Sequence, residues 1–380
     1  MADQSGLLRV GIVSAAWGAT AHLPAWRSLD GVEVTAICTS RPETAERAAR
    51  EHGIPRAFHD FRAMAADPEI DIMDCGTRPP LRHAMVVAAL ENGKHVYNGI
   101  PFAKDWADAR DMAAAWRRAG TVAAVDAFMP AVPAMVQMKA MIAEGWIGET
   151  FGAEIAFDVP LFTAAQTNVP GYVWFADPAN GASALRNLGS HMLHQIVDTF
   201  GPISSVVADQ WLSLTSWPIG EGDVVMPEVA DGASVLIRTQ SGLPVRMSAN
   251  WSKMAGDGFC FSAWGSGGRL ETRAPVFPMA HDTQLFGSQD PALGTAILEP
   301  IEIAETYKRL DGSSALAVDP TTGLLPMAAI FVSMLAEIRG EGRAMPNFER
   351  ALHVQAAIEA ADRSASERRW VDMTEFEDGS

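Results

Sequence analysis

The chain has 380 residues, and its 48% hydrophobic and 20% charged residues are typical of folded globular proteins and exclude a largely disordered chain. Single cores rarely grow beyond about 250–300 residues, so this length predicts two domains. Asp and Glu number 46 against 29 Lys and Arg, and the net charge of −17 argues against binding to nucleic acid or to an anionic membrane surface.

Residues 1–128 alternate short apolar runs with helical patterns. This alternation predicts βαβ units and a parallel sheet with helices on both faces. The expected strands are Leu8–Val13, Val32–Cys38, Ile70–Cys75, Lys94–Tyr97 and Val122–Phe128. The expected helices are Thr20–Ser28, Glu43–His52, Leu81–Glu91 and Trp106–Arg118.

Residues 129–380 follow a different pattern, in which strands dominate and Gly-rich turns join them. This predicts an α+β domain with an open, mostly antiparallel sheet. The expected strands are Phe151–Phe157, Ser205–Gln210, Ala233–Thr239, Val245–Trp251, Phe259–Trp264 and Arg269–Arg273. The expected helices are Ala134–Ile142, Ala184–Phe200, Met327–Arg339 and Glu349–Ser364. Residues 274–322 are rich in Pro, Gly, Asp and Thr and are expected to form a long irregular segment.

The second domain is also expected to join subunits. A large open sheet does not leave an apolar face in water, and the closing helices are too few to cover it while they also pack on the first domain. We therefore expect a homodimer or homotetramer formed through the C-terminal sheet.

The cysteines and the apolar runs indicate the compartment. Cys38, Cys75 and Cys260 each sit in an apolar run, which predicts reduced core thiols in a reducing compartment. No run approaches the roughly 18 apolar residues that span a bilayer, and Met1–Leu7 carries no basic region ahead of an apolar one. A cytoplasmic protein without a membrane segment is expected.

The first strand-to-helix turn is the place where a dinucleotide-binding domain carries G-x-G-x-x-G/A. Here it reads Ser14-Ala15-Ala16-Trp17-Gly18-Ala19, with Ser14 and Ala16 at the first two glycine positions and Ala19 at the third. Small residues tolerate the tight turn, although each Cβ weakens or shifts the approach to a pyrophosphate. Ser14, Ala16, Trp17, Gly18 and Ala19 are candidate cofactor residues; an ordinary turn is the alternative.

The end of the second strand favours NADP(H) over NAD(H). A site for NAD usually has an acidic residue here that binds the ribose 2′-hydroxyl. This chain has Thr39, Ser40 and Arg41 instead, and a serine and an arginine can bind a 2′-phosphate through charge-assisted hydrogen bonds. Arg41 as a merely solvated residue is the alternative.

A set of motifs, in their order and spacing, extends over nearly the whole chain. They are Val10–Val13, His22–Ala25, Asp67–Asp71, Thr77–His83, Asn92–Tyr97, Glu144–Glu149, Asn187–His191, Phe348–Val354 and Glu359–Ala365. Together they resemble the Gfo/Idh/MocA family, named after glucose–fructose oxidoreductase, inositol dehydrogenase and MocA.

The resemblance implies a Rossmann domain, a C-terminal α/β domain and a nicotinamide cofactor. It also implies a small-molecule substrate, because family members oxidise or reduce hydroxyls or carbonyls of sugars, polyols or cyclic dihydrodiols. Thr77 and His83 in the matched T-P-x-x-x-H turn are then cofactor-binding candidates. So are Ile100 and Pro101 in the position of the family's E-K-P turn.

The sequence departs from the family at the chemistry. Gly99-Ile100-Pro101 stands where E-K-P is expected, and Asn187 stands where the family has the Asp of D-x-G-x-H. Isoleucine has no proton to give, and asparagine does not titrate. The usual Lys/Asp/His proton relay is therefore missing, and of its members only His191 remains.

His191 is the main candidate for the acid–base step. On one helix, Asn187, His191 and His194 are spaced to share a face. Histidine exchanges a proton near neutral pH, and Asn187 can orient the imidazole or a substrate hydroxyl. A structural histidine is the alternative. His191, His194 and Asp198 also have a spacing suited to a metal, but no fourth ligand is evident and no metal is expected.

Further candidates surround this helix and the fourth strand. Tyr97 or Tyr172 can assist proton transfer in place of the lysine, although a packing role is the more common one for such residues. Tyr172, Trp174 and His194 are substrate candidates, and the apolar residues near them favour a cyclic or aromatic-derived substrate. Arg186 can bind a substrate carboxylate, or it pairs with an acidic neighbour.

Three functions fit these residues. The first is an NAD(P)-dependent oxidoreductase with a modified proton relay based on His191. The second is a non-catalytic nicotinamide-binding regulator; Val34–Arg41 resembles the galactose-regulon repressors of this fold. The third is a redox-neutral lyase or epimerase that uses a bound nicotinamide.

Overall fold

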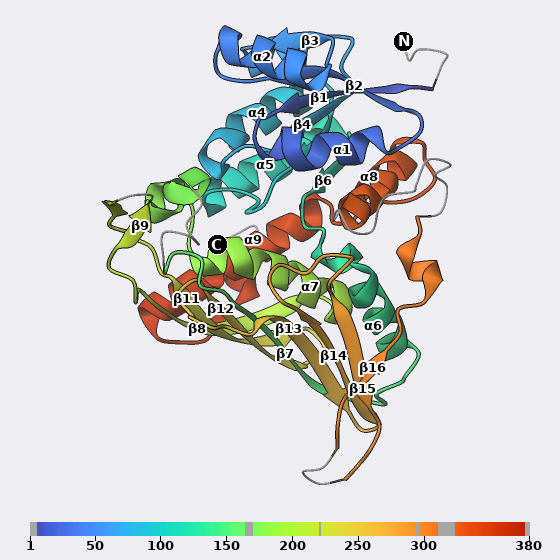
Figure 1. The fold of residues 1–380 in the computed structure, drawn as a ribbon, viewed down its shortest axis with the longest axis vertical. Coiled ribbons are helices and arrows are strands. Elements are labelled where there is room, and N and C mark those ends of the chain that lie inside the picture. The colour runs from blue at the N-terminus through green and yellow to red at the C-terminus, as the bar shows by residue number, and fades with distance from the viewer. Residues whose placement is uncertain (1–5, 164–169, 220–221, 293–295, 311–323, 377–380) are drawn as a thin grey trace. The chain divides into compact units, whose positions relative to one another are not determined.

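The computed structural model describes residues 6–163, 170–219, 222–292, 296–310 and 324–376 (Figure 1). The chain forms two compact units. The first unit combines Met1–Phe128 with Arg309–Leu352, and the second combines Met129–Lys308 with His353–Ser380. The chain passes from the first unit to the second at residue 128, where the sequence predicts a domain boundary, and Arg309–Leu352 returns to the first unit.

The first unit contains a six-stranded parallel sheet in the order β3-β2-β1-β4-β5-β6. Its strands are β1 (Leu8–Val13), β2 (Val32–Cys38), β3 (Arg56–Phe58), β4 (Ile72–Cys75), β5 (His95–Asn98) and β6 (Ala123–Val125). The strand order reverses between β1 and β4. Ligands of such sheets bind at this reversal, beyond the carboxyl ends of the strands.

Helices cover both faces of this sheet. They are α1 (Leu23–Arg27), α2 (Pro42–His52), α3 (Phe61–Ala66), α4 (Pro79–Glu91), α5 (Trp106–Ala119) and α8 (Leu324–Ile338). One core contains residues of α3, α4 and α5, among them Met64, Val86 and Met112. On α1 and α8, Trp26 and Phe331 stack with ring centroids 3.6 Å apart. This buried aromatic pair explains why the late segment belongs to the first unit.

The second unit contains a nine-stranded mixed sheet in the order β16-β15-β14-β13-β7-β12-β11-β8-β17. Neighbouring strands are antiparallel except for β7 and β12. The strands are β7 (Thr150–Asp158), β8 (Ile203–Trp211), β11 (Gly232–Thr239), β12 (Pro244–Asn250), β13 (Gly258–Gly265), β14 (Gly268–Ala274), β15 (Gln284–Ser288), β16 (Glu299–Ile301) and β17 (Val371–Asp372). A separate hairpin pairs β9 (Trp217–Ile219) with β10 (Asp223–Val225).

The segment expected to be irregular contributes two strands to this sheet. β15 pairs with β14 over five residues, and β16 extends the sheet beyond it. The expectation of a structureless excursion over residues 274–322 is therefore wrong for this part. Pairing with the edge of the sheet stabilises a sequence whose local propensity is low. Residues 293–295 and 311–322 of the expected excursion lie outside the described residues.

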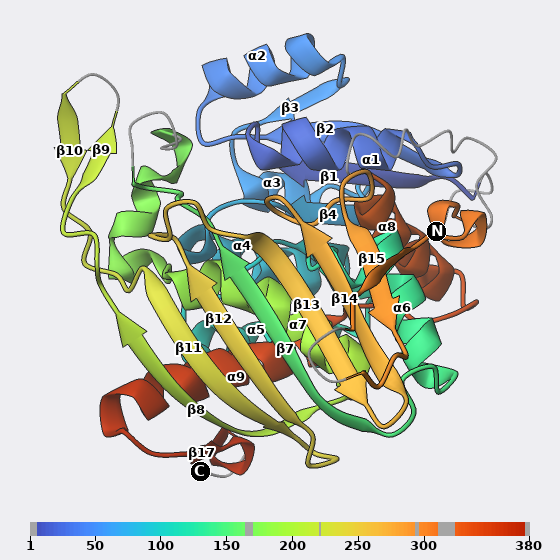
Figure 2. The same cartoon turned by 60° about the horizontal axis from the view of Figure 1, so that its bottom comes forward.

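One face of this sheet carries α6 (Pro133–Ala143), α7 (Ser190–Phe200) and α9 (Phe348–Glu367), which begins in the first unit, and Figure 2 looks onto the other face. Along β11 the outward positions Ser234, Leu236 and Arg238 are exposed, and the residues between them are buried. The period of two matches a sheet with one covered face.

Two helices begin with a π-helical turn that the sequence did not predict. The turn η1 (Gly18–His22) precedes α1, and η5 (Leu185–Gly189) precedes α7. The expected helices Thr20–Ser28 and Ala184–Phe200 are therefore each divided in two. Single π-turns occur frequently at functional sites, and both lie in segments with candidate site residues.

The three cysteines are free thiols whose ionisation is disfavoured. No disulfide is formed; Cys38 and Cys75 are buried and Cys260 is half-buried. Burial raises the pKa of the Cys38 and Cys260 thiols to about 12 and that of Cys75 in the same direction. In the described parts of the chain, no helix is both long enough and apolar enough to cross a bilayer.

Candidate functional site

The first turn of the Rossmann unit leads from Ser14 into η1 at the carboxyl end of β1. The Ser14 hydroxyl oxygen accepts a hydrogen bond from the backbone N–H of Ala16 at 3.1 Å, and the Thr20 hydroxyl donates to the Ala16 carbonyl at 3.1 Å. Small residues with local hydrogen bonds thus form the turn in which the fingerprint has its first two glycines.

Gly18 provides the close helix–strand packing of the fingerprint's third glycine. A Cβ on Gly18 would lie 2.8 Å from Ile12 Cγ2 and 3.0 Å from Ser14 Cβ, so a larger residue would push η1 away from β1. The sequence reading gave this position to Ala19, which is buried beside Gly18. The close contact is therefore one residue earlier than expected.

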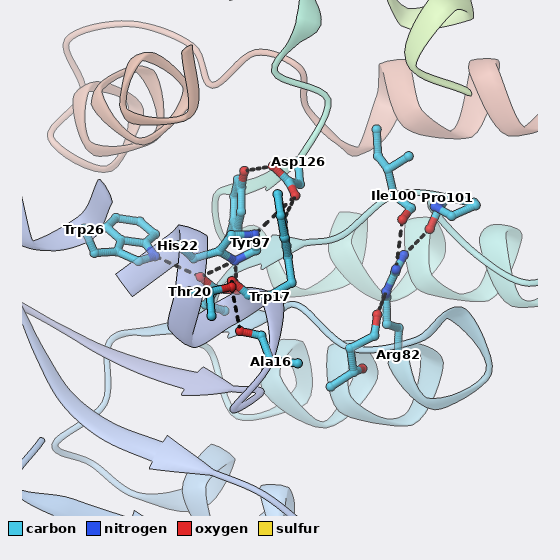
Figure 3. Close-up of polar contacts among 12 residues, drawn as sticks. Ala16, Trp17, Thr20, His22, Trp26, Arg82, Tyr97, Ile100, Pro101 and Asp126 are labelled. Atoms are coloured by element: carbon cyan, nitrogen blue, oxygen red, sulfur yellow. Dashed lines mark hydrogen bonds and ion pairs between the residues drawn. The ribbon is translucent and has the colours of Figure 1, made fainter. Parts of the chain in front are cut away.

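Trp17 is the large exposed side chain of this turn, with 43% of its surface accessible. Its indole N–H donates to Asp126 Oδ2 at 3.0 Å, and Asp126 directly follows β6 (Figure 3). This bond holds the indole in one orientation at the carboxyl edge of the sheet. The exposed ring can therefore offer an apolar face to a planar ligand.

His22 is fully buried between two carboxylates. Its Nδ1 lies 2.8 Å from Asp74 Oδ1, and its Nε2 lies 3.2 Å from Asp126 Oδ2 (Figure 3). Burial alone would lower the pKa of the imidazole, but the two carboxylates outweigh burial and raise the pKa of His22 to about 10. The imidazolium is therefore charged at neutral pH and donates from both nitrogens.

Tyr97 belongs to this buried network and does not face a ligand. Its hydroxyl donates to Asp126 Oδ1 at 2.8 Å, and the Trp26 indole donates to Asp74 Oδ2 at 2.9 Å. Burial and the Asp126 charge raise the pKa of Tyr97 well above its usual value. The candidate role of Tyr97 in proton transfer to a substrate is therefore not supported, because its hydroxyl is fully buried and bonded to a carboxylate.

The residues after β2 lie at the start of α2. The Thr39 and Thr44 hydroxyl oxygens are 2.6 Å apart, and both reach the Arg41 carbonyl. Thr39 thus stabilises the turn, while Ser40 and Arg41 are exposed beyond the strand. Exposed side chains at this place are available to the ribose of a dinucleotide.

In the second unit, His191 lies in the first turn of α7. Its half-buried ring packs edge-on against Phe277, with centroids 4.8 Å apart. In the preceding η5, Asn187 Oδ1 accepts a hydrogen bond from the backbone N–H of Ser183 at 3.2 Å. The amide oxygen of Asn187 is thus engaged locally, which leaves its NH2 group as the part able to donate to a ligand.

His194 and Asp198 do not extend the His191 site. His194 is 1% exposed, so the expected contact with substrate would need a buried side chain to emerge. The Asp198 carboxylate pairs with Lys139 Nζ at 2.9 Å. Within the described residues, no group of three or more His, Cys, Asp or Glu side chains is placed to hold a metal ion.

Arg186 is paired with acidic neighbours on α9. Its guanidinium donates to both Glu359 carboxylate oxygens at 2.9 Å and to Asp362 Oδ2 at 2.5 Å. Burial alone would lower its pKa, but the two carboxylates raise the pKa of Arg186 above its usual value. The acidic-neighbour alternative therefore describes the structure, and the candidate role as a ligand of a substrate carboxylate is not supported.

Tyr172 and Trp174 belong to an aromatic cluster in the short helix η3 (Pro170–Ala176). Both rings contact Phe175, which stacks on Trp251 with centroids 5.2 Å apart. Tyr172 is 37% exposed and Trp174 is half-buried. The structure thus anchors this segment through Phe175 and leaves part of Tyr172 accessible to a ligand.

Comparisons with known proteins match both units. Residues 8–127 match the family model described as "Oxidoreductase family, NAD-binding Rossmann fold", and residues 135–271 match the "GFO/IDH/MocA C-terminal domain". Together the two matches cover more than half of the chain. The chain belongs to the Gfo/Idh/MocA family. It is a nicotinamide-dependent oxidoreductase of this family, as the resemblance of its motifs predicts.

Relatives of this family member include named dehydrogenases. The D-apiose dehydrogenase of Paraburkholderia graminis is 26% identical over 365 residues, which are 94% of this chain and 87% of that protein. The trans-1,2-dihydrobenzene-1,2-diol dehydrogenase of Oryctolagus cuniculus is 28% identical over 44% of this chain and 49% of that protein. A levoglucosan dehydrogenase, solved with NADH and levoglucosan, shares the fold at a TM-score of 0.82 with 21% identity, covering 96% of this chain and 99% of the other.

For this Gfo/Idh/MocA chain, the matched T-P-x-x-x-H turn contains a residue that the sequence reading missed. His83 lies at the side of α4, with Nε2 2.6 Å from Asp111 Oδ2 on α5. The next residue toward the turn, Arg82, is buried, and its Nε donates to the Thr77 carbonyl at 2.6 Å. In the sequence, the signal for the role of Arg82 was a single arginine at a helix position that faces the interior. Arg82, rather than His83, therefore contacts the turns at the carboxyl edge.

Proposed function

We propose that the chain oxidises or reduces a hydroxyl or carbonyl group of a small cyclic substrate, such as a sugar, a polyol or a cyclic diol. The observation that carries the proposal is His191, which occupies the family's catalytic position and is half-buried in the first turn of α7. The relatives named for D-apiose and for dihydrobenzenediol support this range of substrates.

We assign the following roles to the cofactor and to the residues of the site. The nicotinamide cofactor, when bound, accepts or donates the hydride. His191 takes the hydroxyl proton in oxidation and returns it in reduction, because an imidazole exchanges protons near neutral pH. Asn187 donates from its NH2 group to the substrate oxygen and so orients it. Ile100 contributes no proton.

Residues of the first unit fit a dinucleotide. The turn from Ser14 to Gly18 has small residues at the fingerprint's first two glycine positions, where a pyrophosphate is expected to bind, and the fixed indole of Trp17 offers its exposed ring to the planar nicotinamide. Thr77 and the Ile100–Pro101 turn follow β4 and β5 at the same edge. These placements support the assignment of these residues to cofactor binding.

We also infer that NADP(H) binds more tightly than NAD(H). Ser40 and Arg41 are exposed beyond β2, and no carboxylate stands at residues 38–41 to bind a ribose 2′-hydroxyl. Titration of the purified protein with both cofactors tests this inference. Arg41→Ala is expected to weaken NADP(H) about tenfold and to leave NAD(H) unchanged, which corresponds to one charge-assisted hydrogen bond. Tighter binding of NAD(H), unaffected by Arg41→Ala, would contradict it.

The proposed reaction is tested by screening substrates with the bound cofactor. The panel contains pentoses, hexoses, anhydrosugars, inositols and cyclic dihydrodiols, each assayed for the change in nicotinamide absorbance. Turnover of at least one class that depends on His191 supports the proposal. Turnover that persists unchanged in His191→Asn contradicts it.

A second function is favoured by Ile100 and Asn187, which replace the family's titrating lysine and aspartate. A chain without these groups can bind nicotinamide and serve as a regulator, or hold it tightly during a redox-neutral elimination or epimerisation. Micromolar cofactor binding without turnover of any panel member would favour the regulator. Product formation without net change of the cofactor would favour the redox-neutral enzyme.

We infer in addition that the uncovered sheet face joins two copies of the chain. Leu236 on β11 is 48% exposed at an outward position, between Val207 of β8 and Arg246 of β12. A second copy of the sheet placed against this face would remove the Leu236 side chain from water. Light scattering is expected to give at least a dimer and to show dissociation in Leu236→Glu. A strict monomer at micromolar concentration would contradict the inference.

A further inference from the structure

Arg82 is a buried cation whose partners are all uncharged. Its Nε donates to the Thr77 carbonyl at 2.6 Å, its Nη2 to the Ile100 carbonyl at 3.0 Å, and its Nη1 to the Pro101 carbonyl (Figure 3). The residue is 4% exposed, and within the described part of the chain no carboxylate lies within ion-pair distance of it. The planar guanidinium therefore links the turn after β4 to the turn after β5.

Gly99 makes room for this guanidinium. A Cβ on Gly99 would lie 2.9 Å from Arg82 Cζ and 3.0 Å from its Nη2, closer than side-chain atoms approach one another. A left-handed backbone is not the reason for glycine at residue 99, because the φ angle of Gly99 is not positive. Residues 82 and 99 are therefore fitted to each other, at the position where the family's E-K-P turn carries a glutamate.

The same contact orients Ile100. The Ile100 carbonyl oxygen accepts from Arg82, whereas the Ile100 side chain points away from the guanidinium (Figure 3). Binding of two successive carbonyls, of Ile100 and Pro101, fixes the peptide planes on which the direction of this side chain depends. Arg82 thus acts on residue 100 through the backbone.

The charge of Arg82 also matters at this edge of the sheet. Burial disfavours the cation and lowers its pKa, and the carboxylate of Asp126 opposes this effect from a distance. A buried charge without an ionic partner is costly, and a nearby anion reduces the cost. The dinucleotide carries a pyrophosphate and binds beyond the carboxyl ends of these strands. The turns that Arg82 joins follow β4 and β5 at this same edge of the sheet.

We propose that Arg82, seated against Gly99, is the positioning residue that holds the turns at Thr77 and at Gly99–Pro101 in their cofactor-binding geometry. It does so in a chain that lacks the glutamate and lysine of the E-K-P turn. The proposal rests on the nicotinamide cofactor of the proposed function. It adds a residue that binds no substrate but determines how tightly the cofactor is held.

The test measures dissociation constants for NADH and NADPH with the full chain, next to the midpoint of thermal unfolding. Arg82→Met removes the charge and the three donors at similar length, and it is expected to weaken both cofactors about 10–100-fold. Arg82→Lys keeps the charge without the planar fork and is expected to fall between Arg82→Met and the unchanged chain.

Gly99→Ala tests the contact from the other side and retains the arginine. Its Cβ should displace the guanidinium and weaken the cofactors to a similar extent. In the double variant Arg82→Met/Gly99→Ala, the losses should not add, because both changes remove the same contact. If Arg82→Met does not fold, Arg82→Lys and Gly99→Ala carry the same comparison.

Arg9→Met is the matched control. Arg9 also joins two segments, since it binds the Asp71 carboxylate and the Pro68 carbonyl, but it lies on β1 near its amino-terminal end. This variant should lower the unfolding midpoint and leave both dissociation constants unchanged. Unchanged cofactor affinity in Arg82→Met and Gly99→Ala, or losses that match those in Arg9→Met, would overturn the proposal. Absence of cofactor binding in the unchanged chain would instead refute the proposed function.

Discussion

The two units place their histidines in different packing environments. His22 lies between the carboxylates of Asp74 and Asp126, which keep it protonated at neutral pH. His191 follows the uncharged amide of Asn187 and packs against the ring of Phe277. The two carboxylates give His22 a fixed charge, so the presence of a histidine alone does not identify a group that exchanges protons near neutral pH.

The arginines show the reverse distribution. In the second unit, Arg186 binds Glu359 and Asp362, so its charge is compensated within the protein. In the first unit, the carboxylates of Asp74 and Asp126 bind His22. The Arg82 guanidinium binds neutral backbone carbonyls. The Arg186 guanidinium thus binds two carboxylates, whereas the Arg82 guanidinium binds the backbone carbonyls of two turns.

The largest expected effect on stability comes from His22→Gln. Glutamine cannot supply the positive charge, so Asp74 and Asp126 would remain buried without a cation between them. Removal of one partner of a buried ionic network typically costs about 3–5 kcal/mol, and we expect a loss of this size in the free energy of unfolding by denaturant. The exposed His59→Gln is the control and should change stability by less than about 0.5 kcal/mol. Equal stability of the two variants would contradict the fixed charge on His22.

A smaller effect is expected when the compensated pair of the second unit is broken. Arg186→Met leaves Glu359 and Asp362 close together without their cation, and these carboxylates are more exposed than those around His22. We expect a loss of about 2–3 kcal/mol in unfolding free energy and no change in cofactor affinity. A loss of cofactor affinity comparable to that in Arg82→Met would remove the contrast between the two arginines.

The pH dependence of stability provides the finest test of the His22 network. Its pKa is raised from 6.5 to about 10 in the folded chain, so the stabilisation is fully present below pH 6.5 and disappears as the pH rises through 10. Between these values the folded chain holds one more proton than the unfolded chain, and this group lowers the unfolding free energy by about 1.4 kcal/mol per pH unit. Denaturant titrations at pH 7, 8 and 9 measure this slope. It should be absent in His22→Gln; a slope that is the same in both chains would contradict the assignment.

Much of the fold could be predicted because it follows from the periodicity of apolar residues and from the order of the motifs along the chain. The alternation of apolar runs and helical patterns gave the parallel sheet, and the motifs around His95 and His191 gave the family. The short strand β3 was missed because three residues have no detectable period. β15 and β16 were missed because the pairing with a sheet edge that orders them is not local in sequence.

The site was predictable only where one residue type implies one chemistry. The loss of lysine at Ile100 and of aspartate at Asn187 could be read directly. The partners of Tyr97, Arg186 and Arg82 could not, because each bonds to groups distant in sequence, and the same residue types occur in active sites and in cores. The π-turns η1 and η5 were also invisible, since a helical pattern does not reveal one extra residue in a turn.

The central claim is that His191 carries the proton step while His22 keeps a fixed charge. The most direct test is the pH profile of turnover, pH 5–10, for the unchanged chain and for His191→Asn, with cofactor affinity measured at each pH. The account predicts a single ionisation in the range of imidazoles for the unchanged chain. In His191→Asn it predicts turnover lower by about 10²–10⁴-fold, with cofactor affinity nearly intact. Full activity of His191→Asn with a flat pH profile would contradict it.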